Sequence, residues 1–262
     1  MRGELPGKQV EEKKKVNTEV HLFDENDLLY DKKHTCPVCN RDFMTKTLKT
    51  GKAKAVGMDI DMRQRYANID PIKYRIIECP VCGYADMDTT FENVGRKERS
   101  ALREKCIKLY NSVPVTEGAR EYDIAYRYYK SAIRCDLIRG AKSGKRAYTA
   151  LYTAWLLRGW REMLTEMGEE IHEADPMNEA EERKLLKYVY RNFKEAEIHE
   201  EFPINGLSEE VFDIVMAAIA YKLDIKNEAG QYVLRAIHAK TLKGVLRNHA
   251  ENLMDMIKNS EK

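Results

Sequence analysis

Long apolar runs are missing from this sequence. The longest extends only from Ile214 to Tyr221, far short of the roughly 20 residues that a membrane-spanning helix needs. Residues 1–20 are charged and lack the apolar segment of a secretory signal peptide. We therefore expect a cytoplasmic protein with no membrane span.

An excess of one charge sign is missing as well. The 262 residues include 45 Lys and Arg against 43 Asp and Glu, a net charge of +2. That balance is too near neutral for a dedicated nucleic-acid-binding protein, whose field is strongly positive. The alternative hypothesis is therefore a nucleic-acid-binding regulatory protein that contacts phosphates locally, through a cysteine-containing module over residues 31–96 and the basic loop Arg139–Arg146.

Recognisable catalytic motifs are also lacking. Neither His172-Glu173 nor His199-Glu200 continues to the HExxH pattern of zinc proteases, and there is no nucleophile elbow or dinucleotide-binding fingerprint. The segment Arg139–Arg146 resembles a phosphate-binding loop, but its glycines are too close together and an arginine follows Lys145. We interpret it as a basic loop that is either solvated or in contact with an acidic partner or RNA.

What the sequence does contain divides it into three parts. Residues 1–30 have almost no periodic apolar pattern and predict a mobile leader. Residues 31–96 carry paired cysteines and several glycines, and Ile72, Tyr74 and Ile76 alternate as in a half-buried strand, which predicts a small β-rich module. From residue 97 to 262 the apolar residues follow a helical period.

The helical part predicts seven helices in antiparallel hairpins. Helix starts are expected after Asp175, Ser208 and Asn227, each a good N-cap residue. Alanines recur where paired helices would cross, most clearly at Ala229 and Ala236, as in a tetratricopeptide unit. The expected fold is mainly α, an antiparallel helical-hairpin array of tetratricopeptide type with a small β-rich metal module.

The strongest motif is a cysteine knuckle written twice. Cys36-Pro37-Val38-Cys39 recurs as Cys79-Pro80-Val81-Cys82, followed by Gly83, whose freedom at positive φ suits such a turn. Two knuckles supply four thiolates in tetrahedral array, which predicts a metal site at Cys36, Cys39, Cys79 and Cys82. The 39 residues between the pairs exceed the spacing of a compact zinc ribbon, so we expect them to form a hairpin or subdomain.

Zinc is the preferred metal. Rubredoxin-type iron uses the same ligands and stays open as the alternative, whereas disulfides are disfavoured in a reducing compartment. Four protein ligands leave no open coordination position, so the predicted role is structural. His34 is a weaker alternative ligand, and Cys106 and Cys135 are expected to be buried small residues.

A second polar cluster follows the first knuckle. Asp59 and Asp61 are expected on one side of an extended segment, with Asp70 before Pro71. They could hold a cation or a ligand amine, but ordinary turn chemistry is the favoured interpretation. An enzyme that uses Asp59, Asp61 or the tyrosines is the least favoured class, because no nucleophile–base pair is visible.

The chain resembles an uncharacterised family of bacterial cytoplasmic proteins that joins a four-cysteine module to tetratricopeptide-like helices. The resemblance rests on both knuckles and on these further positions: Phe43, Thr45, Lys46, Gly51, Asp59, Asp61, Tyr66, Pro71, Tyr74, Tyr84, Ala85, Ala125, Tyr129, Ala132, Ala154, Trp155, Leu156, Arg158, residues 203–208 and residues 229–237. It implies the architecture and no known reaction.

The expected function is that of a non-enzymatic adaptor. A zinc-stabilised module would be joined to a helical repeat whose concave face holds a peptide or partner protein. Arg134, Arg158 and Tyr221 are the candidate groove residues. The sequence carries no signal for an oligomeric state.

Overall fold

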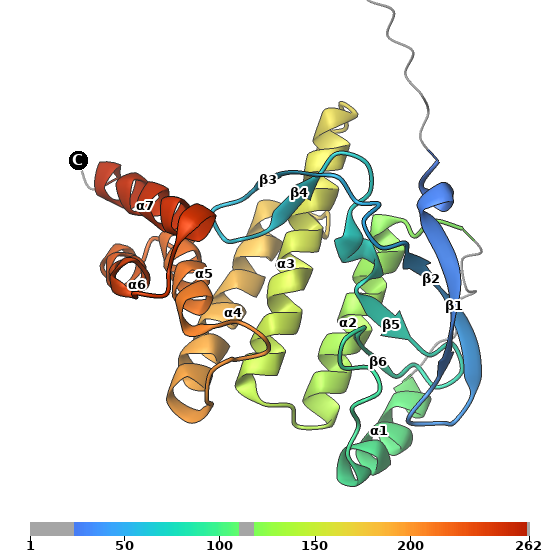
Figure 1. The fold of residues 1–262 in the computed structure, drawn as a ribbon. Coiled ribbons are helices and arrows are strands. Elements are labelled where there is room, and N and C mark those ends of the chain that lie inside the picture. The colour runs from blue at the N-terminus through green and yellow to red at the C-terminus, as the bar shows by residue number, and fades with distance from the viewer. Residues whose placement is uncertain (1–23, 110–117, 261–262) are drawn as a thin grey trace, which may run out of the picture.

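The computed structural model describes residues 24–109 and 118–260. Six short strands and two 3-10 helices precede seven α-helices in this part of the chain (Figure 1). The first region consists of η1 (Glu25–Leu28), β1 (Leu29–Thr35), β2 (Asp42–Leu48), β3 (Ala55–Met58), β4 (Gln64–Tyr66), η2 (Pro71–Tyr74), β5 (Ile76–Glu78) and β6 (Ala85–Met87). The second consists of α1 (Arg96–Leu109), α2 (Tyr122–Ile138), α3 (Ser143–Glu166), α4 (Glu179–His199), α5 (Glu209–Lys222), α6 (Lys226–His238) and α7 (Gly244–Asn259).

The strands pair only with their sequence neighbours. They form three two-stranded antiparallel sheets, β1–β2, β3–β4 and β5–β6. The first is the longest, with its register running from Leu29 opposite Leu48 to Thr35 opposite Asp42. We call residues 24–95 the cysteine module, and α1 to α7 the helical domain.

The predicted strand around residues 72–76 is wrong in its first half. Pro71–Tyr74 forms the 3-10 helix η2, and only Ile76 belongs to a strand, β5. Asp70 causes the difference, because its Oδ1 accepts a hydrogen bond from the Ile72 amide at 3.0 Å and starts a turn that Pro71 continues. The apolar alternation is real, but a local side-chain cap overrides it.

The helical domain confirms the mainly α fold class. Helices α2, α3 and α4 lie side by side with alternating direction, and α5, α6 and α7 continue the array (Figure 1). Small residues fill the crossings: Ala147, Ala150 and Ala154 of α3 are fully buried, as are Ala229 and Ala236 of α6. One apolar core runs from the cysteines through these helices.

Two of the three predicted helix starts move. The Ser208 side chain caps α5 as expected, by accepting from the Val211 amide. Helix α4 is capped by Asn178, whose Oδ1 accepts from the Glu181 amide at 2.8 Å, while Asp175 closes the preceding turn. Helix α6 begins at Lys226 with Ile225 at the N-cap position, so Asn227 is inside the helix.

Part of the predicted leader belongs to the fold. Residues 1–23 lie outside the described part of the chain, but residues 24–30 form η1 and the start of β1. Glu25 anchors them, because its carboxylate accepts two hydrogen bonds from Lys73 Nζ at 2.8 and 2.6 Å. In the described residues no helix is both long and apolar enough to cross a membrane.

Candidate metal centre

The two cysteine knuckles have the same backbone geometry. The Cys36 amide donates to the Arg41 carbonyl at 2.9 Å, and the Cys79 amide donates to the Tyr84 carbonyl at 2.8 Å. In each knuckle the residue after the second cysteine donates back to the first cysteine's carbonyl at 2.9 Å. That residue is Gly83 in one knuckle and Asn40 in the other, with φ of 70° and 58°. Gly83 was predicted to take this conformation, whereas Asn40 was not singled out, although Asn also tolerates it.

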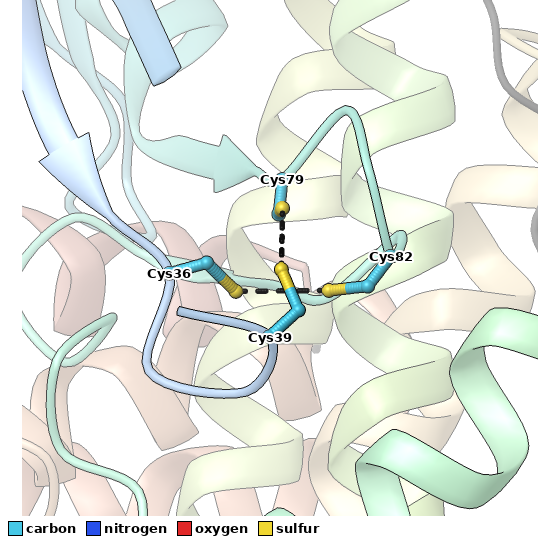
Figure 2. A group of neighbouring side chains, drawn as sticks. All are labelled: Cys36, Cys39, Cys79 and Cys82. Carbon is cyan, nitrogen blue, oxygen red and sulfur yellow. Dashed lines mark hydrogen bonds between the residues drawn. The ribbon is translucent and has the colours of Figure 1, made fainter. Parts of the chain in front are cut away.

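The four sulfurs come together at one point. Cys36 Sγ and Cys82 Sγ lie 3.6 Å apart, Cys39 Sγ and Cys79 Sγ lie 3.7 Å apart, and all four are within 4.8 Å of one another. Figure 2 shows these two pairs crossing, as opposite edges of a tetrahedron do. Zn–S bonds of about 2.3 Å in tetrahedral geometry require edges of roughly 3.8 Å. The spacing therefore fits a metal ion at the centre.

The four cysteine thiols affect one another's protonation. Hydrogen bonds among the sulfurs lower the pKa of the Cys79 thiol, and they raise the pKa of the Cys36 and Cys82 thiols. Thiolate charge is thus disfavoured at two of the sulfurs when no cation is present, because buried like charges repel and lose hydration. A divalent cation would reverse this, so this donor set could hold one.

The remaining candidate ligands lie outside the cluster. His34 is buried, and its ring stacks on Phe43 with centroids 5.7 Å apart while its edge meets Phe91. Cys106 and Cys135 are buried, as expected, but they also contact each other across α1 and α2, with sulfurs 3.5 Å apart. The Ala85 amide donates to Cys135 Sγ at 3.4 Å, so this pair packs against the strand that follows the second knuckle.

Asp59 and Asp61 do hold a cation, and it comes from the chain itself. They lie in the turn between β3 and β4, not in an extended segment. Arg158 of α3 donates from Nη1 to Asp59 Oδ2 at 2.8 Å, and from Nη1 and Nη2 to Asp61 at 2.9 and 2.6 Å. This ion cluster joins the cysteine module to the helical domain.

The cluster has further members that sequence analysis did not find. Glu182 of α4 accepts from Arg158 Nε at 2.8 Å, Arg63 pairs with Asp59 at 2.9 Å and with Glu162, and Lys222 Nζ lies 3.7 Å from Asp61 Oδ2. Asp61 is fully buried. Burial alone would raise the pKa of Asp61, but the charge and hydrogen bonds of Arg158 outweigh it and lower that pKa to about 2.

Half of the positive charges of the basic loop are paired with carboxylates of the chain. Arg139 pairs with Asp86 at 3.0 Å and with Asp136, and Lys145 pairs with Asp86 at 2.5 Å. The backbone amide of Gly144, at the start of α3, donates to Glu200 at 2.7 Å, which places a carboxylate at that helix end. Two of the loop's four positive charges are therefore not free for an external partner.

The predicted groove residues are scattered. Arg158 is buried and occupied by Asp59, Asp61 and Glu182, Tyr221 is half-buried at the end of α5, and Arg134 is exposed on α2. They do not line one open groove.

Comparison with known proteins agrees with the resemblance seen in the sequence. Residues 29–262 match the model of DUF2225, described as an uncharacterized protein conserved in bacteria, and the chain belongs to that family. No curated protein and no solved structure matches the chain.

Proposed function

We propose that this protein is a non-enzymatic adaptor in which a zinc-stabilised module is joined to a helical domain that binds a partner protein. The observation that carries the proposal is the closed donor set: four cysteine sulfurs already satisfy tetrahedral coordination. A zinc ion held by them has no position for substrate or water, so its role is structural. Zinc is preferred over iron because closed four-cysteine sites are common among structural zinc sites.

The helical domain supports the binding role. Its helices pair with their neighbours in an extended array, and such arrays expose long surfaces to extended ligands. Tetratricopeptide-like regularity and a cytoplasmic location belong to the proposal and are inferred from the sequence.

Co-purification tests the adaptor function. Full-length protein, isolated at physiological salt and analysed by light scattering and mass spectrometry, is expected to elute with one partner protein in fixed stoichiometry. Leu151→Ala, which removes a fully buried side chain of α3 and weakens the helical domain, should recover less of this partner, while Cys106→Ser should recover as much as wild type. Elution without a stoichiometric partner from every growth condition tested would contradict the proposal.

Nucleic-acid binding is a second candidate, and one observation favours it. Helix α1 exposes five basic side chains, at Arg96, Lys97, Arg99, Arg103 and Lys105. If they contact phosphates, affinity for RNA or DNA must fall steeply with salt, because each contact releases counterions. Titrating labelled RNA and DNA at two salt concentrations tests this, and no binding at low salt removes the candidate.

A further inference from the structure

The β3–β4 hairpin is held almost entirely at its tip. Its arms are exposed: Ala55, Val56 and Gly57 of β3 and Gln64 and Arg65 of β4 face solvent. Its tip, residues 59–63, is different, because Asp61 is 0 % exposed and Arg63 is 3 % exposed. In Figure 1 the hairpin reaches across the helical domain from the cysteine module.

Three helices of the array bind this tip. Arg158 of α3 holds both aspartates, Lys222 of α5 lies near Asp61, and His249 Nε2 of α7 lies 3.0 Å from the Ile60 carbonyl oxygen. The Arg158 guanidinium thus binds one carboxylate through two nitrogens and a second carboxylate through one, and a histidine contacts a backbone carbonyl. Recognition of an acidic segment of another protein by a helical array would use the same groups. We call Arg158, Lys222 and His249 the tip-binding face.

Helix α4 also contributes to the orientation of Arg158 in the tip-binding face. Glu182 Oε1 of α4 accepts from Arg158 Nε and Nη2 at 2.8 and 2.6 Å, and Arg161 holds the other oxygen of Glu182. Glu182, a residue of the helical domain, therefore helps to orient the Arg158 guanidinium. A site organised in this way loses little entropy when it binds a ligand.

Apolar side chains continue the face along α7. Val245 and Met256 are 75 % and 40 % exposed. They stand four residues before and seven residues after His249, which puts all three on one side of the helix. The hairpin tip leaves both apolar side chains uncovered, so the surface next to the tip has room for a longer segment.

We propose that the tip-binding face is a docking site for an acidic Asp-x-Asp segment of a partner protein, which residues 59–61 occupy in cis. The inference rests on the proposed adaptor function and names both its partner class and its regulation. In the resting chain the hairpin covers the site, and a partner with the same acidic pattern and an adjoining apolar residue displaces it.

A peptide added in trans tests the proposal. The probe is a labelled peptide with the sequence of residues 57–62, whose side chains carry a net charge of −2, and its control carries Asn at both Asp positions. Full-length D59N/D61N keeps the tip's shape without its charges and should bind the acidic peptide at least tenfold more tightly than wild type, where the tethered tip competes at millimolar effective concentration. The Asn peptide should bind neither protein.

Three further substitutions, each added to D59N/D61N, show where on this protein the acidic peptide binds. Lys222→Met and Val245→Glu are each expected to weaken it several-fold, the second only for a peptide extended by apolar residues. Met167→Glu, which alters an exposed side chain at the end of α3, should have no effect. Equal affinity for the acidic and Asn peptides would overturn the proposal.

Wild-type protein gives a second measurement if D59N/D61N fails to fold. Hydrogen exchange of residues 55–66 should rise when the acidic peptide is present at millimolar concentration, and not with the Asn peptide. Unchanged exchange would overturn displacement. A stoichiometric partner that wild type and Val245→Glu capture equally would leave the adaptor function standing and reject this site alone.

Discussion

The cysteine module and the helical domain differ in the interactions that stabilise their folds. The strands of the module have three to seven residues and pair only in twos, an arrangement that is marginal without other support. The helices have 13 to 24 residues, and α2 to α6 bury alanine and aromatic side chains against one another. We therefore expect the module to depend on a metal ion at its cysteines and on its ion pairs with the helical domain, whereas the helices depend chiefly on complementary packing.

This difference gives the 39-residue spacer between the knuckles a purpose. The spacer carries β3, β4 and the acidic tip that contacts Arg158, and a knuckle stands at each of its ends. The metal would fix both ends of the segment that reaches the helices. Order in the module and contact with the helical domain should then be lost together.

Loss of one thiolate is expected to have the largest effect. Structural zinc contributes about 10–16 kcal/mol to the folding of zinc-finger peptides, so Cys79→Ser should leave residues 24–95 without a stable fold. Hydrogen exchange read segment by segment is expected to rise throughout the module and at the tip, while α3 to α6 stay protected. Cys106→Ser is the matched control, and it should change neither metal content nor protection of the module.

Truncating a core side chain of the helical domain should destabilise the helices and leave the metal site intact. Leu151→Ala removes a fully buried side chain of α3 and should lower the free energy of unfolding by about 2–5 kcal/mol. Denaturant unfolding followed by far-ultraviolet circular dichroism measures this. The metal content of the folded protein should stay unchanged. Loss of metal in Leu151→Ala would show that the metal site depends on the packing of the helices, which contradicts the difference between the two regions.

Acid should weaken the link between the regions through Asp61. Its pKa is lowered from 3.8 to about 2 in the folded chain, so its stabilisation is present above pH 4 and disappears as the pH falls from about 4 to 2. The contribution is about 2 kcal/mol. The gap in unfolding free energy between wild type and Asp61→Asn should therefore close over that range. Metal loss at low pH affects both proteins and cancels in the difference, and a gap independent of pH would contradict the account.

The smallest expected effect comes from substitutions at the positive-φ residue of each knuckle. Gly83→Ala places a side chain on a backbone with φ of 70° and should cost about 1–2 kcal/mol. Asn40→Ala, at φ of 58°, should lower the stability by less, because the native Asn40 already has a Cβ atom and so already pays part of the cost of a positive φ. Thermal unfolding of the metal-loaded proteins measures both costs. A larger loss at Asn40 than at Gly83 would mean that the knuckles are not equivalent.

Sequence alone predicted what depends on local chemistry. The knuckles, the positive φ of Gly83, the Ser208 cap and the seven helices all follow from residues within a few positions of one another. The strand predicted through Tyr74 failed because a cap at Asp70 competes with apolar alternation. The N-cap at Asp175 failed because the helix starts three residues later, where Asn178 accepts a hydrogen bond from the Glu181 amide.

Contacts between distant segments could not be predicted in this way. The sequence predicts Arg158 as a groove residue and Asp59 as a turn residue, and nothing in it indicates that they bind each other. Their pairing depends on how the hairpin crosses α3, a property of the tertiary fold. The neutralisation of Arg139 and Lys145 by Asp86 has the same origin, and so does the contact between Cys106 and Cys135.

The metal content of the purified protein tests the central claim most directly. Native mass spectrometry of full-length protein, isolated without added metal, should show one zinc ion per chain. Four thiols should become titratable only when that ion is chelated. A folded, metal-free chain in which Cys36, Cys39, Cys79 and Cys82 react freely would contradict the account.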